Sequence, residues 1–373
     1  MSSRAPSKKN EDARRAAFVQ QYIKDRHDKL ADKAEKKSNN VTTNYLAYKE
    51  FSYEGWEKIS ESFQKRKFNS FYKGKKAKKV QRKVNLILSD LHYGADLDPR
   101  LVPDKYKEIE ESRRTAGVCA QVADYKRDHR AETELDIHLI GDIIQGKLHD
   151  VQNAAALTAQ HARAMHCLIG AIEFLAKEYS KVTVRTSVGN HGRDVARHPD
   201  RALQDKYDSN EFRIYDSLKS AFRNHPGVVF DVKIRPFYIY DQFGHKGYMS
   251  HGDTHIKPGF PNKAIDVEKL RRQINEFRIS DEEHLKVKLF GFGHVHVAMD
   301  VDISGATIVT NGCLIPTDEY AQSIGIFNTP CRQQLWETTP GHMFGDHRKL
   351  EITTDHDKDA SLDKIIPPWP GFE

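Results

Sequence analysis

The pattern of hydrophobic and polar residues changes near residue 84. From there on, short runs rich in β-branched and aromatic residues alternate with longer stretches in which apolar residues recur every three or four positions. The short runs predict strands at Val84–Ser89, Leu135–Ile140, Lys181–Val188, Val228–Ile234, Phe237–Asp241, Gly247–Ser250, Val287–Gly291 and Ala306–Thr310. The longer stretches predict helices at Asp104–His129, Val151–Tyr179, Arg201–Asn224 and Asn262–Arg278. This alternation favours a layered α/β structure, to which the closely spaced later strands add an antiparallel portion.

The two ends of the chain follow other patterns. Residues 11–37 are rich in Ala, Glu, Lys and Arg and predict a helix, and a second helical element is expected within residues 44–67. After Thr317 the periodicity fades, and residues 355–373 end in a Pro-rich sequence that predicts an extended tail, either disordered or docked on a partner. We therefore expect three parts, namely a basic, largely helical extension at 1–83, a central domain at 84–320 and a C-terminal extension at 321–373.

Charge is distributed unevenly along the chain. The net charge of +6 combines 23 Lys and Arg against 10 Asp and Glu in residues 1–83 with an acidic remainder. Residues 62–83 contain ten basic residues, no acidic residue and several aromatic ones, a mixture that suits single-stranded or distorted nucleic acid. The candidates for this contact are Lys65, Arg66, Lys67, Phe71, Tyr72, Lys75 and Lys76. A solvated linker whose aromatic residues pack on the body explains the run equally well.

Composition disfavours several classes of protein. The polar opening sequence is unlike a signal peptide, and the most apolar stretch, residues 166–176, is too short for a membrane span and includes Glu173. The four cysteines have no paired spacing, so neither a disulfide framework nor a structural zinc site is indicated. We expect a cytoplasmic protein without membrane contact, and a homodimer is compatible with the sequence.

Residues with carboxylate, amide or imidazole groups follow five of the predicted strands. Their sequences are Asp90-Leu91-His92, Gly141-Asp142, Gly189-Asn190-His191, His251-Gly252 and Gly293-His294-Val295-His296. In extended backbone, residues two positions apart point the same way, so Asp90 and His92 can reach one ion, and His294 and His296 repeat this geometry. Open α/β sheets place their sites at the carboxyl ends of strands. We therefore expect these side chains to converge at one edge.

The types of donor indicate the metal and the chemistry. Carboxylates, an amide oxygen and imidazoles suit a pair of divalent cations, and the mixture favours Mn²⁺ or Fe²⁺ over Mg²⁺, with Zn²⁺ also compatible. Two such ions held about 4 Å apart activate a water molecule and orient a phosphoryl group for in-line attack. The sequence therefore predicts a dinuclear site that acts on phosphate esters.

The ordered series resembles the calcineurin-like metallophosphoesterase superfamily over about Val84–Pro316, and its form Asp90-Leu91-His92-Tyr93-Gly94 is most similar to the SbcD-type DNA repair exonucleases. The resemblance implies a two-layer β-sandwich flanked by helices, with two manganese ions at one edge of a catalytic domain at 84–320. It implies a first ion held by Asp90, His92, Asp142 and His296, a bridging role for Asp142, and a second ion completed by Asn190, His251 and His294. It makes His191 a general acid beside the scissile phosphate and not a ligand.

Two positions depart from the family pattern. Gly-Asn-His is commonly followed by an acidic residue, whereas Gly192 stands here, so the usual carboxylate support of the catalytic His is absent or displaced to Asp194. In the nuclease branch a His often lies three residues after the bridging Asp, and Gln145 occupies that place. Both differences leave the ligand series intact and bear on the nuclease branch specifically.

Three functions are compatible with these residues. The first is a nuclease that hydrolyses DNA phosphodiester bonds through a hydroxide activated by two metal ions, with Arg193 and Arg197 contacting a neighbouring phosphate unless they form a solvated helix face. The second is a phosphomonoesterase or a small-molecule (nucleotide) phosphodiesterase with the same site. The third is a nucleic-acid-binding protein with an inactive site, which the intact ligand series disfavours.

The resemblance to the nuclease branch also implies partners and a source. Its members work with a coiled-coil ATPase, so an ATPase or a replication or repair protein is the partner that the resemblance implies. A compact nuclease with a divergent arm suits a phage or mobile element, in which case the protein would act in the host cytoplasm.

Overall fold

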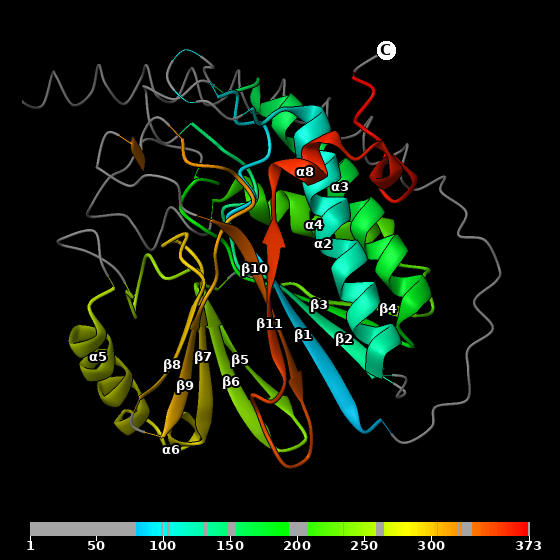
Figure 1. Cartoon of the computed structure of the whole chain (residues 1–373). Coiled ribbons are helices and arrows are strands. Elements are labelled where there is room, and N and C mark those ends of the chain that lie inside the picture. Colours follow the sequence, from blue (N-terminus) through cyan, green and yellow to red (C-terminus); the bar gives the residue numbers. More distant parts are fainter. Residues whose placement is uncertain are drawn as a thin grey trace, which may run out of the picture. The chain divides into compact units, whose positions relative to one another are not determined.

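The computed structural model describes residues 80–97, 100, 102, 105–129, 133–147, 154–193, 208–233, 235–258, 265–303, 305–318, 321–322 and 330–371. The helices expected before residue 68 and all seven candidates for nucleic-acid contact lie outside these residues, as do Asp194 and Arg197. The described chain forms two β-sheets with helices packed on them (Figure 1). The predicted α/β class, with two sheets flanked by helices, is thereby confirmed.

The first sheet contains six strands in the order β11-β10-β1-β2-β3-β4. Their bounds are β1 Arg82–Leu88, β2 Thr133–Leu139, β3 Val182–Thr186, β4 Val228–Asp231, β10 Cys331–Thr338 and β11 His347–Ile352. The strands β1 to β4 are parallel, whereas β10 pairs antiparallel with both β1 and β11. Most residues of β1, β2 and β3 are buried, as expected for parallel strands covered on both faces.

The second sheet contains five strands in the order β5-β6-β7-β9-β8. Their bounds are β5 Phe237–Gln242, β6 His245–Ser250, β7 Val287–Phe292, β8 Met299–Ile303 and β9 Ala306–Thr310. The central strands β6, β7 and β9 are parallel, and β5 and β8 pair antiparallel at the two edges. Both sheets therefore present a group of parallel strands whose carboxyl ends share one edge.

All eight predicted strands are present, with ends that differ by a few residues, but β8, β10 and β11 were not predicted. The reason is clearest in β10, where Gln333 and Gln334 are buried and interrupt the apolar pattern. Both side chains form hydrogen bonds, for example from Gln334 Nε2 to the carbonyl oxygen of Thr310 at 3.0 Å. Although β10 and β11 lie in the range 321–373, which we expected to be an extension, they complete the first sheet beside β1.

Four long helices cover the sheets, and each matches a predicted helical stretch. Their bounds are α2 Glu108–His129, α3 Leu157–Glu178, α4 Asn210–Ala221 and α5 Val267–Ile279, and a short helix α6 covers Glu282–Leu285. The helices α2 and α3 pack side by side on the first sheet (Figure 1). Leu270 and Ile274 of α5 pack on the second sheet against Phe290. No helix in the described ranges has both the length and the apolar character needed to cross a membrane.

The two sheets face each other across a shared apolar interior. One buried cluster contains Ile87, Ile140 and Trp336 from the side of the first sheet and Tyr238, Met249, Leu289 and Val309 from the second. A polar network lies beside it, in which His138 is 2.8 Å from the Tyr238 hydroxyl and 3.1 Å from Asn85 Oδ1. Asn85 also donates to Gln242 Oε1 at 3.1 Å. Because an unpaired polar group is costly in such an interior, this network fixes how the sheets lie against each other.

The residues after β11 pack on the helices of the first sheet. They form α8 Thr354–Lys358 and the 3₁₀-helix η3 Ala360–Lys364, so the prediction of an extended tail from residue 355 is wrong for this part of the chain. Arg113 of α2 forms a bidentate ion pair with Asp363, in which Nε donates to Oδ1 at 2.8 Å and Nη2 donates to Oδ2 at 2.9 Å. His166 of α3 donates to the carbonyl oxygen of Pro367 at 2.6 Å. The C-terminal segment is therefore docked on this chain's own α2 and α3.

The ion pair between Arg114 and Asp357 provides a test of this docking. Arg114 is 2% exposed, and its Nε and Nη2 each donate to the Asp357 carboxylate at 2.7 Å. We expect Asp357→Ala to reduce the free energy of unfolding by about 3–5 kcal/mol, because it leaves a buried guanidinium without its carboxylate. Asp124→Ala removes a carboxylate that pairs with Arg127 at the surface and should cost about 0.5 kcal/mol or less. Urea unfolding curves of the two variants that coincide would contradict the docking.

Candidate metal centre

The predicted donors lie just beyond the carboxyl ends of five strands. β1 ends two residues before Asp90, β2 three residues before Asp142, and β3 four residues before Asn190. In the second sheet, β6 ends immediately before His251 and β7 ends two residues before His294. Because β1, β2 and β3 are parallel to one another, as are β6 and β7, their ends bring residues that are far apart in the sequence to one place.

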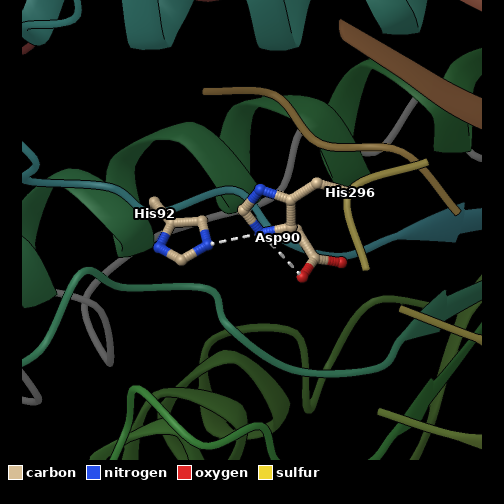
Figure 2. A group of neighbouring side chains, drawn as sticks. All are labelled: Asp90, His92 and His296. Atoms are coloured by element: carbon tan, nitrogen blue, oxygen red, sulfur yellow. Dashed lines mark hydrogen bonds and ion pairs between the residues drawn. The ribbon is translucent and has the colours of Figure 1, made fainter. Parts of the chain in front are cut away.

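The first group of candidate ligands consists of Asp90, His92 and His296 (Figure 2). One potential ligand atom from each residue lies within 4.8 Å of the others. The Nε2 atoms of His92 and His296 are 3.2 Å apart, and His296 Nε2 is 3.3 Å from Asp90 Oδ1. These three atoms therefore surround a position that a single cation can occupy.

The second group consists of Asp142, His251 and His294, again with ligand atoms within 4.8 Å of one another. His251 Nε2 lies 3.0 Å from Asp142 Oδ2 and 3.1 Å from the amide oxygen of Asn190. Asp142 also forms a group with His92 and His191. It is thus the residue that links the two sets of donors.

The backbone at these residues differs from the extended geometry that the sequence suggested. Asp90 and His92 have φ values of 55° and 50°, and His294 and His296 have 70° and 56°. They are in the left-handed region, which non-glycine residues rarely adopt, although Asp and His tolerate it better than most. The expectation that His294 and His296 reach one ion is wrong, because His294 lies in the second group and His296 in the first. The resemblance implied this division, but the argument from extended backbone did not.

Hydrogen bonds from the Nδ1 atoms orient the imidazole rings of His251 and His92. The Nδ1 of His251 donates to the carbonyl oxygen of Ile140 at 2.9 Å, and the Nδ1 of His92 donates to Gln145 Oε1 at 2.8 Å. Both residues therefore turn Nε2 toward the carboxylates. Such contacts fix the tautomer of a metal-binding imidazole and increase its basicity.

Asp90 is supported by residues to which the sequence did not draw attention. The Ser89 hydroxyl donates to Asp90 Oδ2 at 2.5 Å and accepts from Asn311 Nδ2 at 2.9 Å, while the main-chain N–H of His294 donates to Asp90 Oδ1 at 2.9 Å. Gln333 of β10 accepts from both the Ser89 N–H and Asn311. The position of Ser89 next to Asp90 was the only signal available, because Asn311 and Gln333 are distant in the sequence.

The two carboxylates stay ionised although they are buried. Burial raises the pKa of Asp142, but His251 and His191 outweigh this effect and hold the pKa well below its usual range. Burial lowers the pKa of His251, yet contact with Asp142 raises it to about 9. Burial and the charge of His251 lower the pKa of His294 to about 4, so this imidazole remains neutral. The centre therefore pairs the ionised Asp142 with a protonated His251, whose Nε2 proton a bound cation would replace, and keeps the His294 imidazole neutral.

His191 lies beside Asp142 and is held by the loop that follows β2. Its Nδ1 donates to the carbonyl oxygen of Gln145 at 2.8 Å, and its main-chain N–H donates to Asp142 Oδ1 at 2.8 Å. His191 Nε2 is 4.0 Å from Asp142 Oδ2. A main-chain carbonyl group thus supports His191, where the family pattern has a carboxylate and the sequence predicted this support to be absent or displaced to Asp194. Gln145 holds His92 with its side chain and His191 with its main chain.

Arg193, a predicted contact for a substrate phosphate, forms an ion pair with a carboxylate that follows the fourth motif. Its Nη2 is 3.2 Å from Asp253 Oδ2, and both side chains are 6% exposed. The pair ties the loop after His191 to the loop after His251. The structure thus places the Arg193 guanidinium next to the centre but against a protein carboxylate.

The donor set fits two divalent cations. Each group combines a carboxylate with two imidazoles, and Asn190 adds an amide oxygen beside the second group. In His92 and His251 the nitrogen facing the carboxylates is the one opposite a fixed hydrogen bond, as expected for an oriented ligand. Among the described residues, every group of three or more His, Cys, Asp or Glu side chains with this spacing belongs to this centre.

Comparison with known proteins gives only distant likenesses. No protein-family model and no curated protein matches the chain. Similar solved structures include an archaeal phosphodiesterase, 10% identical with a TM-score of 0.32, which covers 71% of this chain and 98% of the other. Vps29 from Entamoeba histolytica with Zn²⁺ is 11% identical with a TM-score of 0.29 (72% and 99% covered). The sulfate thiohydrolase SoxB from Thermus thermophilus with glycerol is 11% identical with a TM-score of 0.32 (79% and 62% covered). Likenesses at this level do not define a family, so the function is inferred below from the donors themselves.

The contact between Gln145 and His92 predicts how the first group responds to substitution. Gln145→Leu removes the acceptor for His92 Nδ1, and we expect it to weaken binding of Mn²⁺ by about 10–100-fold, whereas Gln145→Glu keeps an acceptor and should retain affinity. Gln121→Leu is the control, because this glutamine of α2 donates to the main-chain carbonyl oxygen of Glu351 in β11 and is bonded to none of the donors. Affinity is measured by competition with a coloured chelator. Wild-type affinity in Gln145→Leu would show that this hydrogen bond does not orient the ligand.

Proposed function

We propose that this chain is a dinuclear metal-dependent phosphoesterase. The observation that carries the proposal is the pair of donor groups that meet at Asp142, with His191 at their side. Mixed carboxylate and imidazole donors in two adjacent groups can hold a pair of cations, and such a pair promotes in-line displacement at phosphorus. Mn²⁺ is the proposed cofactor, with Fe²⁺ and Zn²⁺ as alternatives, because the set contains imidazoles as well as oxygen donors.

The residues of the centre then have distinct tasks. Bound divalent cations would lower the pKa of a water molecule and neutralise charge on the phosphate. Asp142 holds the two groups together, while Asp90, His92 and His296 on one side and Asn190, His251 and His294 on the other keep the donors oriented. His191 has Nδ1 fixed on the Gln145 carbonyl, so Nε2 is the nitrogen that we assign to protonation of the leaving oxygen. A positioned general acid contributes about 10²–10⁴-fold to the rate.

We further propose that the substrate is a DNA phosphodiester. Support comes from the form Asp90-Leu91-His92-Tyr93-Gly94, which resembles the repair exonucleases, and from the basic and aromatic residues between 62 and 83. The second candidate is a phosphomonoester or a small (nucleotide) phosphodiester, since the same donors serve both reactions. The ion pair of Arg193 with Asp253 favours this candidate, because the Arg193 guanidinium, which was expected to contact a neighbouring phosphate of the DNA backbone, is paired with a protein carboxylate instead.

Hydrolysis of end-labelled linear single- and double-stranded DNA with Mn²⁺ tests the proposal. We expect the wild-type protein to cleave DNA and His191→Ala to retain both metal ions by elemental analysis but to lose about 10²–10⁴-fold in turnover. Bis-p-nitrophenyl phosphate and p-nitrophenyl phosphate are assayed in parallel. Turnover of the aryl esters without DNA cleavage would support the second candidate, and metal loss in His191→Ala would show that His191 is a ligand.

The N-terminal region provides a separate test of DNA as the substrate. Because β1 begins at Arg82, a deletion of residues 1–79 leaves the sheet intact. We expect this deletion to weaken DNA binding and to flatten its dependence on salt, by about 0.7–0.9 in logarithmic slope for each phosphate group that the region neutralises. Cleavage of an aryl phosphodiester should continue at the wild-type rate. If the salt dependence of DNA binding equals that of the full chain, the region contacts no phosphate group and acts only as a linker.

A further inference from the structure

Glu211, at the start of α4, is a buried carboxyl group outside all five motifs. It is 0% exposed, and its two oxygens accept hydrogen bonds from two different loops. The main-chain N–H of Ile143 donates to Oε1 at 2.7 Å, and the main-chain N–H of Gly189 donates to Oε2 at 2.6 Å. Ile143 directly follows Asp142, and Gly189 directly precedes Asn190. A single side chain therefore ties together the backbones that carry two donors of the second group.

The two loops joined by Glu211 are in direct backbone contact. A Cβ atom added to Gly141 would collide with the main chain of Gly189, and one added to Gly189 would collide with the backbone and the carboxylate of Asp142. The two loops can therefore approach this closely only because glycine is present on both sides. Whatever holds them at this separation also sets the spacing between the donors on either side.

The helix that presents Glu211 is itself fixed to the same loop. Ser209 caps α4 by accepting from the Glu211 N–H at 3.2 Å, and the Tyr215 hydroxyl, one turn further on, donates to the carbonyl oxygen of Ser187 at 3.1 Å. The carboxyl group thus projects from a short, anchored element. Groups held in this way position a site more closely than groups on loops do.

We propose that Glu211 is a positioning residue of the second metal group, which holds Asp142 and Asn190 at the separation that one cation requires. The inference rests on the proposed dinuclear site. A carboxylate suits the task because it has two acceptor oxygens for two N–H donors. An amide has one acceptor only, so Gln at this position turns a donor toward one of the two N–H groups.

Metal binding by Glu211→Gln tests this role independently of catalysis. We expect the variant to bind the second Mn²⁺ at least about 10-fold more weakly than wild type, while the first ion binds as before. The stoichiometry is read by elemental analysis after dialysis at fixed free Mn²⁺. In electron paramagnetic resonance, we expect the wild-type protein to give the spectrum of a coupled pair of Mn²⁺ ions and Glu211→Gln to give the six lines of an isolated Mn²⁺. Ser209→Ala removes the cap of the same helix without touching the carboxyl group, so it should lower the melting temperature but keep both ions.

The outcomes separate this inference from the proposed function. Two ions of wild-type affinity in Glu211→Gln, or equal weakening of both ions with a lowered melting temperature of the metal-free protein, would overturn the positioning role. If Glu211→Gln does not fold, Glu211→Asp, which keeps the charge but is one methylene too short to reach both loops, is expected to show the same selective loss. A wild-type protein that binds two ions but hydrolyses no phosphate ester would refute the proposed function and leave the test of Glu211 valid.

Discussion

Two buried carboxylates just beyond the ends of β1 and β2 dictate how the surrounding loops and both sheets are arranged. Asp90 and Asp142 are 0% and 1% exposed, and a buried charge is tolerated only when other charges or hydrogen bonds compensate for its lack of hydration. His296 and His251 approach them at 3.3 and 3.0 Å, and main-chain N–H groups complete their contacts. The histidines compensate for the buried negative charge of these two side chains. The left-handed backbone and the glycine residues allow the loops to approach closely enough for these contacts to form.

The two sheets contribute unequally to this compensation. The first supplies the carboxylates together with His92 and His191, and the second supplies His251, His294 and His296 from the ends of β6 and β7. The packing of one sheet on the other therefore decides whether the groups form at all. Strand β10 strengthens this link, because Gln333 and Asn311 support Asp90 through Ser89. A part of the chain that looks like an extension in the sequence is thus part of the support of the centre.

The polar groups around the ligands depart from the pattern of the family that the sequence resembles, yet the ligands remain oriented. Gln145 supports His92 with its amide oxygen and His191 with its main-chain oxygen, at 2.8 Å in both cases. Glu211 joins the loops of Asp142 and Asn190 from the side of α4. Orientation of a ligand needs an acceptor at the correct place, and different residues can provide it.

Most of the secondary structure and the set of candidate donors could be predicted from the amino-acid sequence. Periodicity located eight strands and four helices, because burial selects apolar residues at fixed spacing, and the Asp, Asn and His residues were recognisable at the strand ends. The separation of His294 and His296 into different groups followed from the family resemblance but not from extended backbone geometry, and the folded chain shows the left-handed turns that produce it. Only the tertiary structure placed β10 beside β1 and Glu211 between two loops. Such contacts join residues that are distant in the sequence, 68 positions apart for Glu211 and Ile143, and no local pattern records such pairing.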